Sequence, residues 1–254
     1  MFAEQRRNTI LELLGRMGSV SVTELHRRLK VSRETIRRDI NTLAAGNRLQ
    51  KTHGGALSIE SVEPGFAERM SVNIDGKRAI GRMAATLVAD GASLIIDSGT
   101  TTLCLADALA TRHGLTVYTN DVQVAARLAG RNENRVFIVG GEVTGSEGAM
   151  LGRDATAMLE NYFADFAFIG ASAVSAERGL TDYTREAAEL RKLMLANART
   201  TVLLADHSKF KRVAPVRVSA LDELDTLITD NPMKGDSAVY FKGLKCDVLV
   251  AGKP

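Results

Sequence analysis

The sequence predicts two domains: a small N-terminal domain of helices followed by a β-hairpin, and a larger α/β domain built on a parallel sheet. Residues 20–56 hold two short helical patterns and then an extended basic segment that ends in two glycines. From residue 77 onward, short apolar strand patterns alternate with helical patterns, which is typical of a parallel sheet covered on both faces. The 254 residues are enough for two domains, each with a core of its own.

The distribution of charge suggests that any contact with a polyanion is made by the N-terminal part of the chain. Hydrophobic residues make up an ordinary 45% of the chain. Residues 1–60 carry 11 lysines and arginines against 6 acidic residues, whereas residues 61–254 carry the remaining 22 and 24. The net charges of +5 and −2 are expected if only the N-terminal part meets nucleic acid, although an excess of this size supports that function only weakly.

Cysteine usage and hydropathy indicate a cytoplasmic protein. Cys104 and Cys246 stand in apolar runs without a partner motif, which is typical of reduced core cysteines rather than of a disulfide or a metal pair. No apolar run approaches the roughly 18 residues that cross a bilayer. The N-terminus leads into a helix with no apolar signal core. We therefore expect no membrane partner, no metal site and no cofactor.

The N-terminal domain begins with a helix whose apolar residues recur at helical spacing. These residues are Ile10, Leu11, Leu13, Leu14 and Met17. Gly18 is expected to end this helix, and a short strand follows around Ser21. Thr23 is the expected cap of the second helix, which carries Leu25 and Leu29.

The next helix combines a strong start with a basic outer face. Ser32 is a good N-cap, and Glu34 in the first turn suits the positive end of the helix dipole. The core-facing residues are four and three positions apart: Ile36, Ile40 and Leu43. The other side of the helix carries Ser32, Arg33, Thr35, Arg37 and Arg38.

Such a face suits a helix that enters the major groove of DNA. Residues at the start of a recognition helix reach base edges, so we assign Arg33 and Thr35 to base contacts. Arg37 and Arg38, further along, are assigned mainly to phosphates. The alternative is a solvated helix face stabilised by Glu34 and Arg38 at i, i+4 spacing. The preceding helix and the following hairpin favour the interpretation as a DNA-binding helix.

A basic hairpin after this helix completes a winged helix-turn-helix. After a helix break at Gly46, residues 48–52 are extended, and Gly54-Gly55 permits a tight turn. Lys51 and His53 are placed to approach phosphates or the minor groove together with the turn at Gly54. His53 could equally serve to stabilise the turn. We expect this domain, residues 1–57, to bind a double-stranded DNA operator.

The rest of the chain is predicted to be a linker and a ligand-binding α/β domain. Residues 58–76 show no clear periodicity and are expected to form the linker, and residues 77–254 form the second domain. The expected strands cover residues 93–96, 115–118, 136–139, 166–169, 201–205, 226–228 and 246–250. The expected helices lie around residues 80–88, 103–109, 122–128, 155–159 and 187–198.

Polar residues follow the first of these strands at the point where parallel sheets bind ligands. The segment is Asp97-Ser98-Gly99-Thr100-Thr101-Thr102, directly before a helix. A glycine and four hydroxyls at a helix N-terminus supply backbone donors, side-chain donors and the positive dipole end, which predicts a phosphate cradle. A hydroxyl-rich helix cap is the alternative, but it needs only one or two of these residues. No nucleotide-binding glycine motif is present.

Later strands end in comparable residues. The candidate ligand contacts among them are Asn120, Gly140, Gly141, Gly170, Asp206 and Lys209. The glycines would let the backbone approach a ligand, although tight turns would explain them equally well. Asp206 and Lys209 could bind sugar hydroxyls and phosphate together, with a surface turn capped by the aspartate as the alternative.

Two sets of motifs resemble one family. S-x-x-T-I-R-R-D and H-G-G-A resemble the DeoR-type bacterial transcriptional regulators, in particular the glycerol-3-phosphate repressor branch. D-S-G-T-T-T, V-G-G, I-G-A-S and D-H-S-K-F resemble the effector domain of that family, which is similar to sugar-phosphate isomerases related to ribose-5-phosphate isomerase. The resemblance implies a repressor of sugar or glycerol-phosphate catabolism genes that senses a phosphorylated sugar. Arg191 stands where family members often carry lysine.

An enzyme is the competing interpretation: a sugar-phosphate isomerase or deaminase with an appended DNA-binding domain. Aldose–ketose chemistry needs a general base and a group that polarises the carbonyl. Asp97 and Asp206 are candidate bases, and Lys209 is a candidate electrostatic partner. No further acid or histidine cluster joins them in the sequence, which favours a regulator without catalytic residues. Since helix-turn-helix proteins usually read two half-sites, we also expect a homo-oligomer, a dimer or a tetramer.

Overall fold

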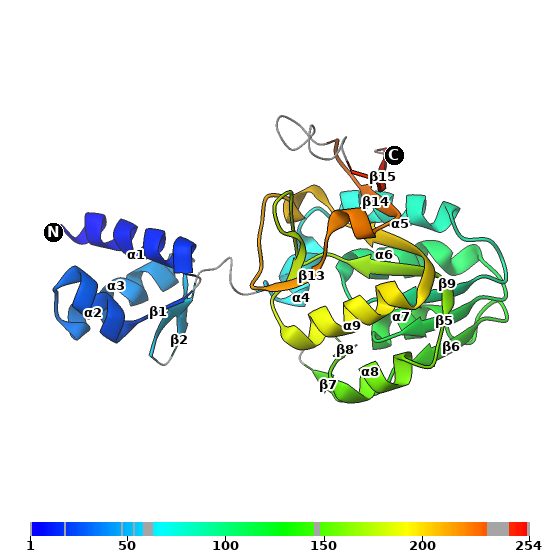
Figure 1. Ribbon diagram of the computed structural model, residues 1–254, viewed down its shortest axis with the longest axis horizontal. Helices are drawn as coiled ribbons and strands as arrows, with labels where there is room; N and C mark the ends of the chain where they lie inside the picture. The colour runs from blue at the N-terminus through cyan, green and yellow to red at the C-terminus, as the bar shows by residue number, and fades with distance from the viewer. Residues whose placement is uncertain are drawn as a thin grey trace. The chain divides into compact units, whose positions relative to one another are not determined.

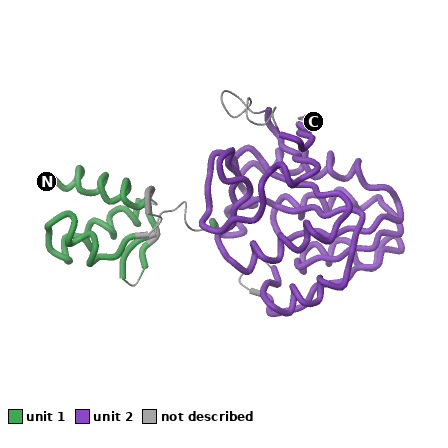
Figure 2. The backbone as a smooth tube through the Cα atoms, viewed as in Figure 1, with its two compact units in different colours: residues 1–63 green, residues 64–254 purple. Residues whose placement is uncertain are grey.

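The computed structural model describes residues 2–17, 19–46, 48–52, 54–57, 63–144, 148–232 and 244–252. The chain forms two compact units, residues 1–63 and 64–254 (Figures 1 and 2). The predicted linker, residues 58–76, is therefore too long, because the second unit already begins at Pro64. Helix α4 (Phe66–Ser71) and the start of α5 (Ile74–Thr86) belong to the second unit, where Phe66 and Met70 pack against its core. These two apolar side chains on a six-residue helix were too few to produce a recognisable period.

The first unit is a winged helix-turn-helix. Its elements are α1 (Ala3–Met17), β1 (Ser19–Ser21), α2 (Val22–Leu29), α3 (Arg33–Ala45), β2 (Gln50–Thr52) and β3 (Gly55–Leu57). The three strands pair antiparallel in the order β1-β3-β2, so the wing is anchored to the strand before α2. Helix α2 is capped by Ser21, whose side chain accepts from the Glu24 amide, and not by Thr23 as expected.

A buried ion pair fixes α3, the predicted DNA-binding helix, against α1. Arg6 Nε lies 2.5 Å from Asp39 Oδ2, and its terminal nitrogen donates to Asp39 Oδ1 at 3.2 Å. Both side chains are almost fully buried. Apolar residues of all three helices form the core of this unit, with Ile10, Leu25 and Ile36 fully buried. The orientation of α3 is therefore set by a two-point charged contact as well as by packing.

The second unit is built on a seven-stranded parallel sheet. The strand order is β15-β14-β12-β9-β4-β5-β6. The strands are β4 (Ser93–Ile96), β5 (Thr116–Thr119), β6 (Arg135–Ile138), β9 (Ala164–Gly170), β12 (Ala198–Leu204), β14 (Thr226–Thr229) and β15 (Asp247–Val250). The predicted strands all correspond to members of this sheet, which confirms the α/β class.

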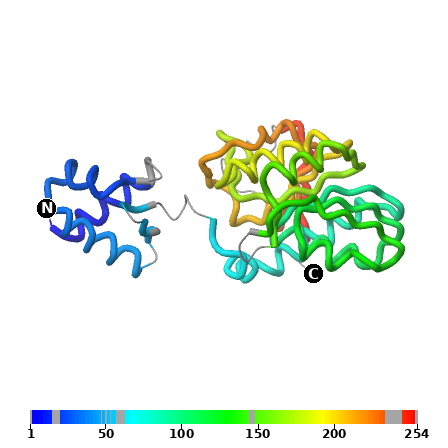
Figure 3. The backbone as a smooth tube through the Cα atoms, turned by 90° about the horizontal axis from the view of Figure 1, so that it is seen from below, coloured from blue at the N-terminus to red at the C-terminus, as the bar shows by residue number. Residues whose placement is uncertain are grey.

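Helices cover both faces of the sheet, each with its own apolar core. One core includes residues of α5, α6 (Thr100–Ala108) and α7 (Val122–Leu128). The other includes residues of α8 (Arg153–Leu159) and α9 (Arg185–Ala196). In Figure 3 the cyan and green part of this unit lies below the yellow and orange part. The alternation of strand and helix patterns in the sequence therefore correctly predicted a parallel sheet with helices on both faces.

Several short antiparallel strands were not predicted. One small sheet joins β10 (Ala173–Ser175), β11 (Gly179–Asp182) and β13 (Val216–Ser219), and a hairpin joins β7 (Val143–Thr144) to β8 (Ala149–Met150). Strands of two to four residues are too short to show an alternating pattern.

Cys104 and Cys246 are buried and not bonded to each other, and burial raises the pKa of both thiols. Among the described residues, none of the helices combines the length and apolarity needed to cross a membrane. The same residues contain no cluster of three or more metal-binding side chains.

Candidate operator-binding and effector-binding sites

The N-terminus of α3 is organised by two hydroxyls. Ser32 Oγ accepts from the Thr35 amide at 3.1 Å and lies 2.8 Å from Thr35 Oγ1, so Ser32 is the predicted cap. The three arginines assigned to DNA are all exposed: Arg33, Arg37 and Arg38. The outer face of the helix therefore presents cations over its first half, and its N-terminus presents a hydroxyl pair.

The ion pair on this face differs from the alternative considered for the sequence. Glu34 lies 3.8 Å from the guanidinium of Arg37, at i, i+3 spacing, rather than pairing with Arg38. Both side chains are more than 60% exposed, and exposed pairs of this kind contribute little stability. A phosphate can therefore replace Glu34 as the partner of Arg37 at small cost.

The wing brings a second cation to the recognition helix. Arg37 of α3 and Lys51 of β2 line one cavity of about 520 Å³. Of the two wing glycines, Gly55 is the one that the fold requires, because a Cβ there would collide with the Val20 backbone. A Cβ on Gly54 would meet nothing within 4 Å, so the fold gives Gly54 no packing reason to be glycine. His53 lies outside the described residues.

In the second unit, Asp97 follows β4, and one of its carboxylate oxygens accepts two hydrogen bonds. Its Oδ2 accepts from the Gly170 amide at 3.1 Å and from Arg191 Nε at 2.7 Å. Arg191 also pairs with Asp182 and donates to Ser172 Oγ at 3.4 Å. Asp97 and Arg191 are both buried. This network joins the ends of β4 and β9, which are neighbours in the sheet, so Asp97 and Gly170 hold the edge together.

The loop after Asp97 leads into α6 through a glycine in an unusual conformation. Gly99 has φ +146° and ψ 167°, a region that side chains other than hydrogen rarely allow. Its carbonyl accepts from Thr102 Oγ1 at 2.9 Å. Thr100, Thr101 and Thr102 are buried in the first turn of α6. The predicted cradle is therefore a helix N-terminus surrounded by hydroxyls.

A side-chain bridge ties this loop to the next strand. Asn120, at the end of β5, accepts from the Ser98 amide at 2.9 Å and donates to Ser98 Oγ at 3.3 Å. Asp121 caps α7 beside it, and burial raises the pKa of this carboxyl group. Hydrogen bonds thus join Asp97 to Gly170 and Ser98 to Asn120, on either side of the loop that contains Gly99.

The remaining predicted contacts lie elsewhere on the same edge. Gly140 and Gly141 follow β6, the last strand of the sheet, and only Gly141 has a positive φ, +131°. Asp206 and Lys209 follow β12, which lies on the other side of β9 from β4. Asp206 is fully buried, and its Oδ1 accepts from the Ser208 amide at 3.0 Å. Its Oδ2 has no hydrogen-bond partner in the described part of the chain.

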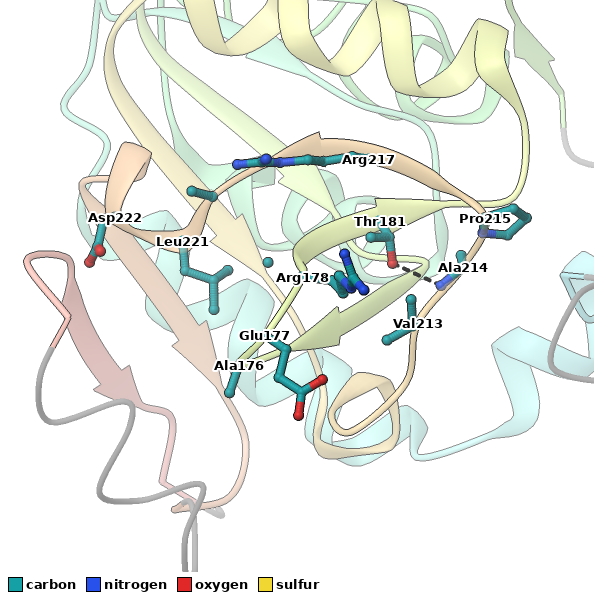
Figure 4. Close-up of a pocket in the computed structure, with 12 residues that line it drawn as sticks. Ala176, Glu177, Arg178, Thr181, Val213, Ala214, Pro215, Arg217, Leu221 and Asp222 are labelled. Carbon is teal, nitrogen blue, oxygen red and sulfur yellow. Dashed lines mark hydrogen bonds between the residues drawn. The ribbon is translucent and has the colours of Figure 1, made fainter. Parts of the chain in front are cut away.

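A separate cavity of about 480 Å³ lies against the small antiparallel sheet (Figure 4). Arg178 and Arg217 line it together with Glu177 and Asp222, so its cations are matched by anions. Thr181 Oγ1 accepts there from the Ala214 amide at 2.8 Å. None of the predicted effector contacts lines this cavity.

Comparison with known proteins identifies the family. The DeoR-like helix-turn-helix domain matches residues 6–62, and the DeoR C terminal sensor domain matches residues 72–231. The chain belongs to the DeoR family. It is 35% identical to the HTH-type transcriptional regulator GolR of Listeria innocua, over 95% of each chain. It is 33% identical to the glycerol-3-phosphate regulon repressor of Escherichia coli, over 90% of this chain and 91% of that one.

Among solved structures, 54% of this DeoR-family chain is similar to ribose 5-phosphate isomerase A of Methanocaldococcus jannaschii. The identity is 21% and the TM-score 0.41, over 54% of this chain and 55% of that one. The relatives from Listeria and Escherichia are transcriptional regulators, as the motifs of this sequence indicated.

Sequence reasoning missed residues that complete the edge. Asp182 lies in the small antiparallel sheet, outside the parallel-strand pattern, and Ser172, although part of the I-G-A-S motif, was not singled out as a contact. Arg191 was noticed only for its difference from other DeoR-family members, although it is the cation that compensates Asp97. A basic residue on the otherwise buried face of a helix was the available signal.

Proposed function

We propose that this DeoR-family regulator is a cytoplasmic repressor of sugar or glycerol-phosphate catabolism genes, and that a phosphorylated sugar or polyol controls its affinity for operator DNA. Helix α3 and the wing would bind the operator, with Arg33 and Thr35 at bases and Arg37, Arg38 and Lys51 at phosphates. A homo-oligomer would place two such helices on two half-sites.

The geometry of the α6 N-terminus carries the effector half of this proposal. The first N–H groups of an α-helix have no acceptors within the helix, and the helix dipole favours an anion beside them. Gly99 lets the backbone approach a phosphate, and Thr100 and Thr101 add hydroxyl groups, whereas the Thr102 hydroxyl already donates to the Gly99 carbonyl. Arg191 pairs with Asp97, which offsets the negative charge of one carboxylate beside this loop. The name of the Escherichia relative, a glycerol-3-phosphate regulon repressor, supports the same class of metabolite.

We further propose that the second unit binds its effector without turnover. A general base must be able to take a proton from the substrate. Asp97 Oδ2 already accepts from the Gly170 amide and from Arg191 Nε, so this oxygen is occupied and is not placed to take a proton from a substrate. Turnover assays on phosphorylated aldoses and ketoses should give no product above the uncatalysed rate. Product formation that is lost in Asp206→Asn and Lys209→Ala would restore the enzyme hypothesis.

The direct test is a titration on DNA. A duplex operator is first selected from a random pool with the purified full-length protein. Glycerol 3-phosphate, ribose 5-phosphate, fructose 1-phosphate and fructose 6-phosphate are then titrated against the complex, with glycerol, ribose and fructose as matched controls. We expect a phosphorylated compound to change operator affinity at concentrations where its unphosphorylated control has no effect. Equal responses to both members of every pair would contradict the proposed cradle.

Two arginine variants test the DNA-binding half. Arg37→Ala should weaken binding similarly on all duplexes and lower the slope of the salt dependence by about 1, because it removes one phosphate contact. Arg33→Ala should relax discrimination at one base position, by roughly 1–3 kcal/mol. Wild-type affinity, salt dependence and discrimination in both variants would contradict the assignment of α3.

A further inference from the structure

Asn73, at the junction of α4 and α5, makes contacts that are distant in the sequence. Its Nδ2 donates to Asp230 Oδ2 at 2.8 Å and to Asp206 Oδ1 at 3.5 Å, and lies 3.2 Å from His207 Nδ1. Asp206 and Asp230 follow β12 and β14 at the carboxyl edge of the sheet. A single amide therefore connects the first helices of the second unit to two loops at the effector edge.

The local backbone is arranged for this contact. Asn73 occupies the N-cap position of α5 with φ 54° and ψ 42°, a left-handed conformation that asparagine tolerates. An asparagine at this position usually caps its own helix, but here the side chain makes no capping hydrogen bond. A Cβ on Gly76 would lie 2.5 Å from Asn73 Nδ2 and 2.6 Å from Asp230 Oδ2, so glycine keeps this space open.

A second series of contacts continues from Asn73 to Pro64, at the start of the second unit. The amide of Lys77 donates to the Asn73 carbonyl at 3.1 Å, and its buried ammonium donates to the Arg69 carbonyl in α4. Arg69 is buried as well, and its Nε donates to the Pro64 carbonyl at 2.9 Å. Pro64 is the first residue of the second unit. The series Asp206, Asn73, Lys77, Arg69, Pro64 thus runs from the effector edge to the point where the chain leaves the DNA-binding unit.

The charge of Asp206 also affects the pKa of Lys77. Burial lowers the pKa of the Lys77 ammonium, and the negative charge of Asp206 raises it in opposition. Asp206 has one carboxylate oxygen that makes no hydrogen bond within the described residues. A sugar hydroxyl that bonds to Asp206 would therefore change the interaction of this carboxylate with both Asn73 and Lys77.

We propose that Asn73 and Lys77 couple effector binding to operator affinity, by transmitting a change at Asp206 to α4 and so to the chain entering the DNA-binding unit. The proposal rests on the proposed function, because it takes the effector to act at the carboxyl edge. Coupling requires that the effector bind two arrangements of these contacts with different affinity. Couplings between sites commonly change an affinity by about 5- to 150-fold.

The matched variants are Asn73→Gly and Asn132→Gly in the full-length protein. Glycine keeps the left-handed backbone at both positions and removes the amide. Asn132 has φ 48°, and its Nδ2 donates to the carbonyls of Ala110 and Arg112, away from the series. Lys77→Met removes the downstream ammonium. Each protein is measured for glycerol 3-phosphate affinity by calorimetry, and for operator affinity with and without 10 mM glycerol 3-phosphate.

If wild-type operator affinity responds to glycerol 3-phosphate, we expect Asn73→Gly and Lys77→Met to keep its binding within threefold but to lose most of the response. Asn132→Gly should respond as wild type. The double variant should lose no more than either single one, because both act in one series. A full wild-type response in Asn73→Gly would overturn the proposal.

If wild-type operator affinity does not respond, the proposed effector function fails for this compound and the contacts are tested separately. Hydrogen exchange of residues 64–77 is then compared without any ligand. Faster exchange in Asn73→Gly and Lys77→Met than in Asn132→Gly and wild type would support the mechanical connection. Unchanged exchange in both variants would reject it.

Discussion

The polar residues at the amino and carboxyl edges of the parallel sheet differ in how they are hydrogen-bonded. At the amino edge, the Asp165 carboxylate accepts from the amide and the hydroxyl of Ser93, at 2.9 and 2.7 Å, and the Asp165 amide donates back to the hydroxyl at 2.9 Å. Asp225 and Thr201 repeat this arrangement between β14 and β12, at 2.7, 2.8 and 2.9 Å. Each pair is reciprocal, and each lies where two neighbouring strands begin to pair.

At the carboxyl edge, the polar groups are more deeply buried and less completely bonded. Asp97, Asp121 and Asp206 are at most 2% exposed. Within the described residues, Asp206 Oδ2 and Thr229 Oγ1 have no hydrogen-bond partner. A buried polar atom without a partner costs free energy that a closed reciprocal pair does not. The amino edge therefore stabilises the register of the strands, whereas the carboxyl edge leaves buried polar atoms that the proposed effector could bond.

The largest expected effect is on the effector response, and it should differ between substitutions of two glycines at opposite ends of β4. Gly99→Val should raise the effector concentration for half-maximal response roughly 100-fold, or about 3 kcal/mol, because the strained backbone must move away from the phosphate. Gly91 has φ +80° and open space around a Cβ, so Gly91→Val carries a similar backbone cost at the amino edge. Its response should match wild type. Operator titrations with effector measure both, and equal loss in the two variants would remove the distinction between the edges.

A smaller effect is expected from a cation at the carboxyl edge. Lys209→Ala should raise the half-maximal effector concentration about tenfold, the value of one charge-assisted contact near 1.5 kcal/mol. Lys211 is exposed two residues later and provides the matched control. The measurement is the same titration on a preformed operator complex. A Lys211→Ala effect as large as that of Lys209→Ala would point to general electrostatic attraction instead of a bound phosphate.

The smallest expected effect is that of a substitution at the amino edge, which should change only the free energy of unfolding. Ser93→Ala should lower the free energy of unfolding by about 1 kcal/mol at pH 7 and leave the effector response unchanged. The hydrogen bonds from Ser93 lower the pKa of Asp165 in the folded protein. Stability from this carboxyl group is therefore present above its unfolded pKa near 4 and is lost as pH falls through the folded pKa.

Urea unfolding at a series of pH values checks this prediction. Because Ser93→Ala brings the folded pKa of Asp165 closer to its unfolded value, the difference between variant and wild type should shrink below pH 4. A constant difference across the acid range would show that the hydroxyl acts without coupling to the ionisation of Asp165.

The sequence was most informative where one element is followed directly by another. The run from the apolar strand β4 into residues 97–102 predicted the strand end correctly, whereas the helix expected from residue 103 begins three residues earlier, at Thr100. The partners of these residues could not be predicted in the same way. Arg191 reaches Asp97 across 94 positions, and this contact depends on the strand order, which local patterns do not specify.

Two further differences have local physical causes. Asn73 makes its contacts from a left-handed residue between two helices, where no periodicity marks a role. The wing turn contains two glycines that look alike in the sequence, yet only the approach of β3 to β1 shows that Gly55 is the sterically required one. Patterns along the chain locate elements and their ends, whereas close approaches between elements depend on tertiary packing.

Hydrogen exchange of the full-length protein tests the contrast between the two edges most directly. The probe is the phosphorylated compound with the largest thermal shift among those titrated, present at 100 times its dissociation constant, where binding adds about 2.7 kcal/mol to stability. We expect slower exchange in residues 97–103 and 206–210, and no local change beyond the global stabilisation in residues 90–93 and 164–166. Protection confined to the amino edge, or bound compound with no local protection of residues 97–103, would contradict the proposed effector site.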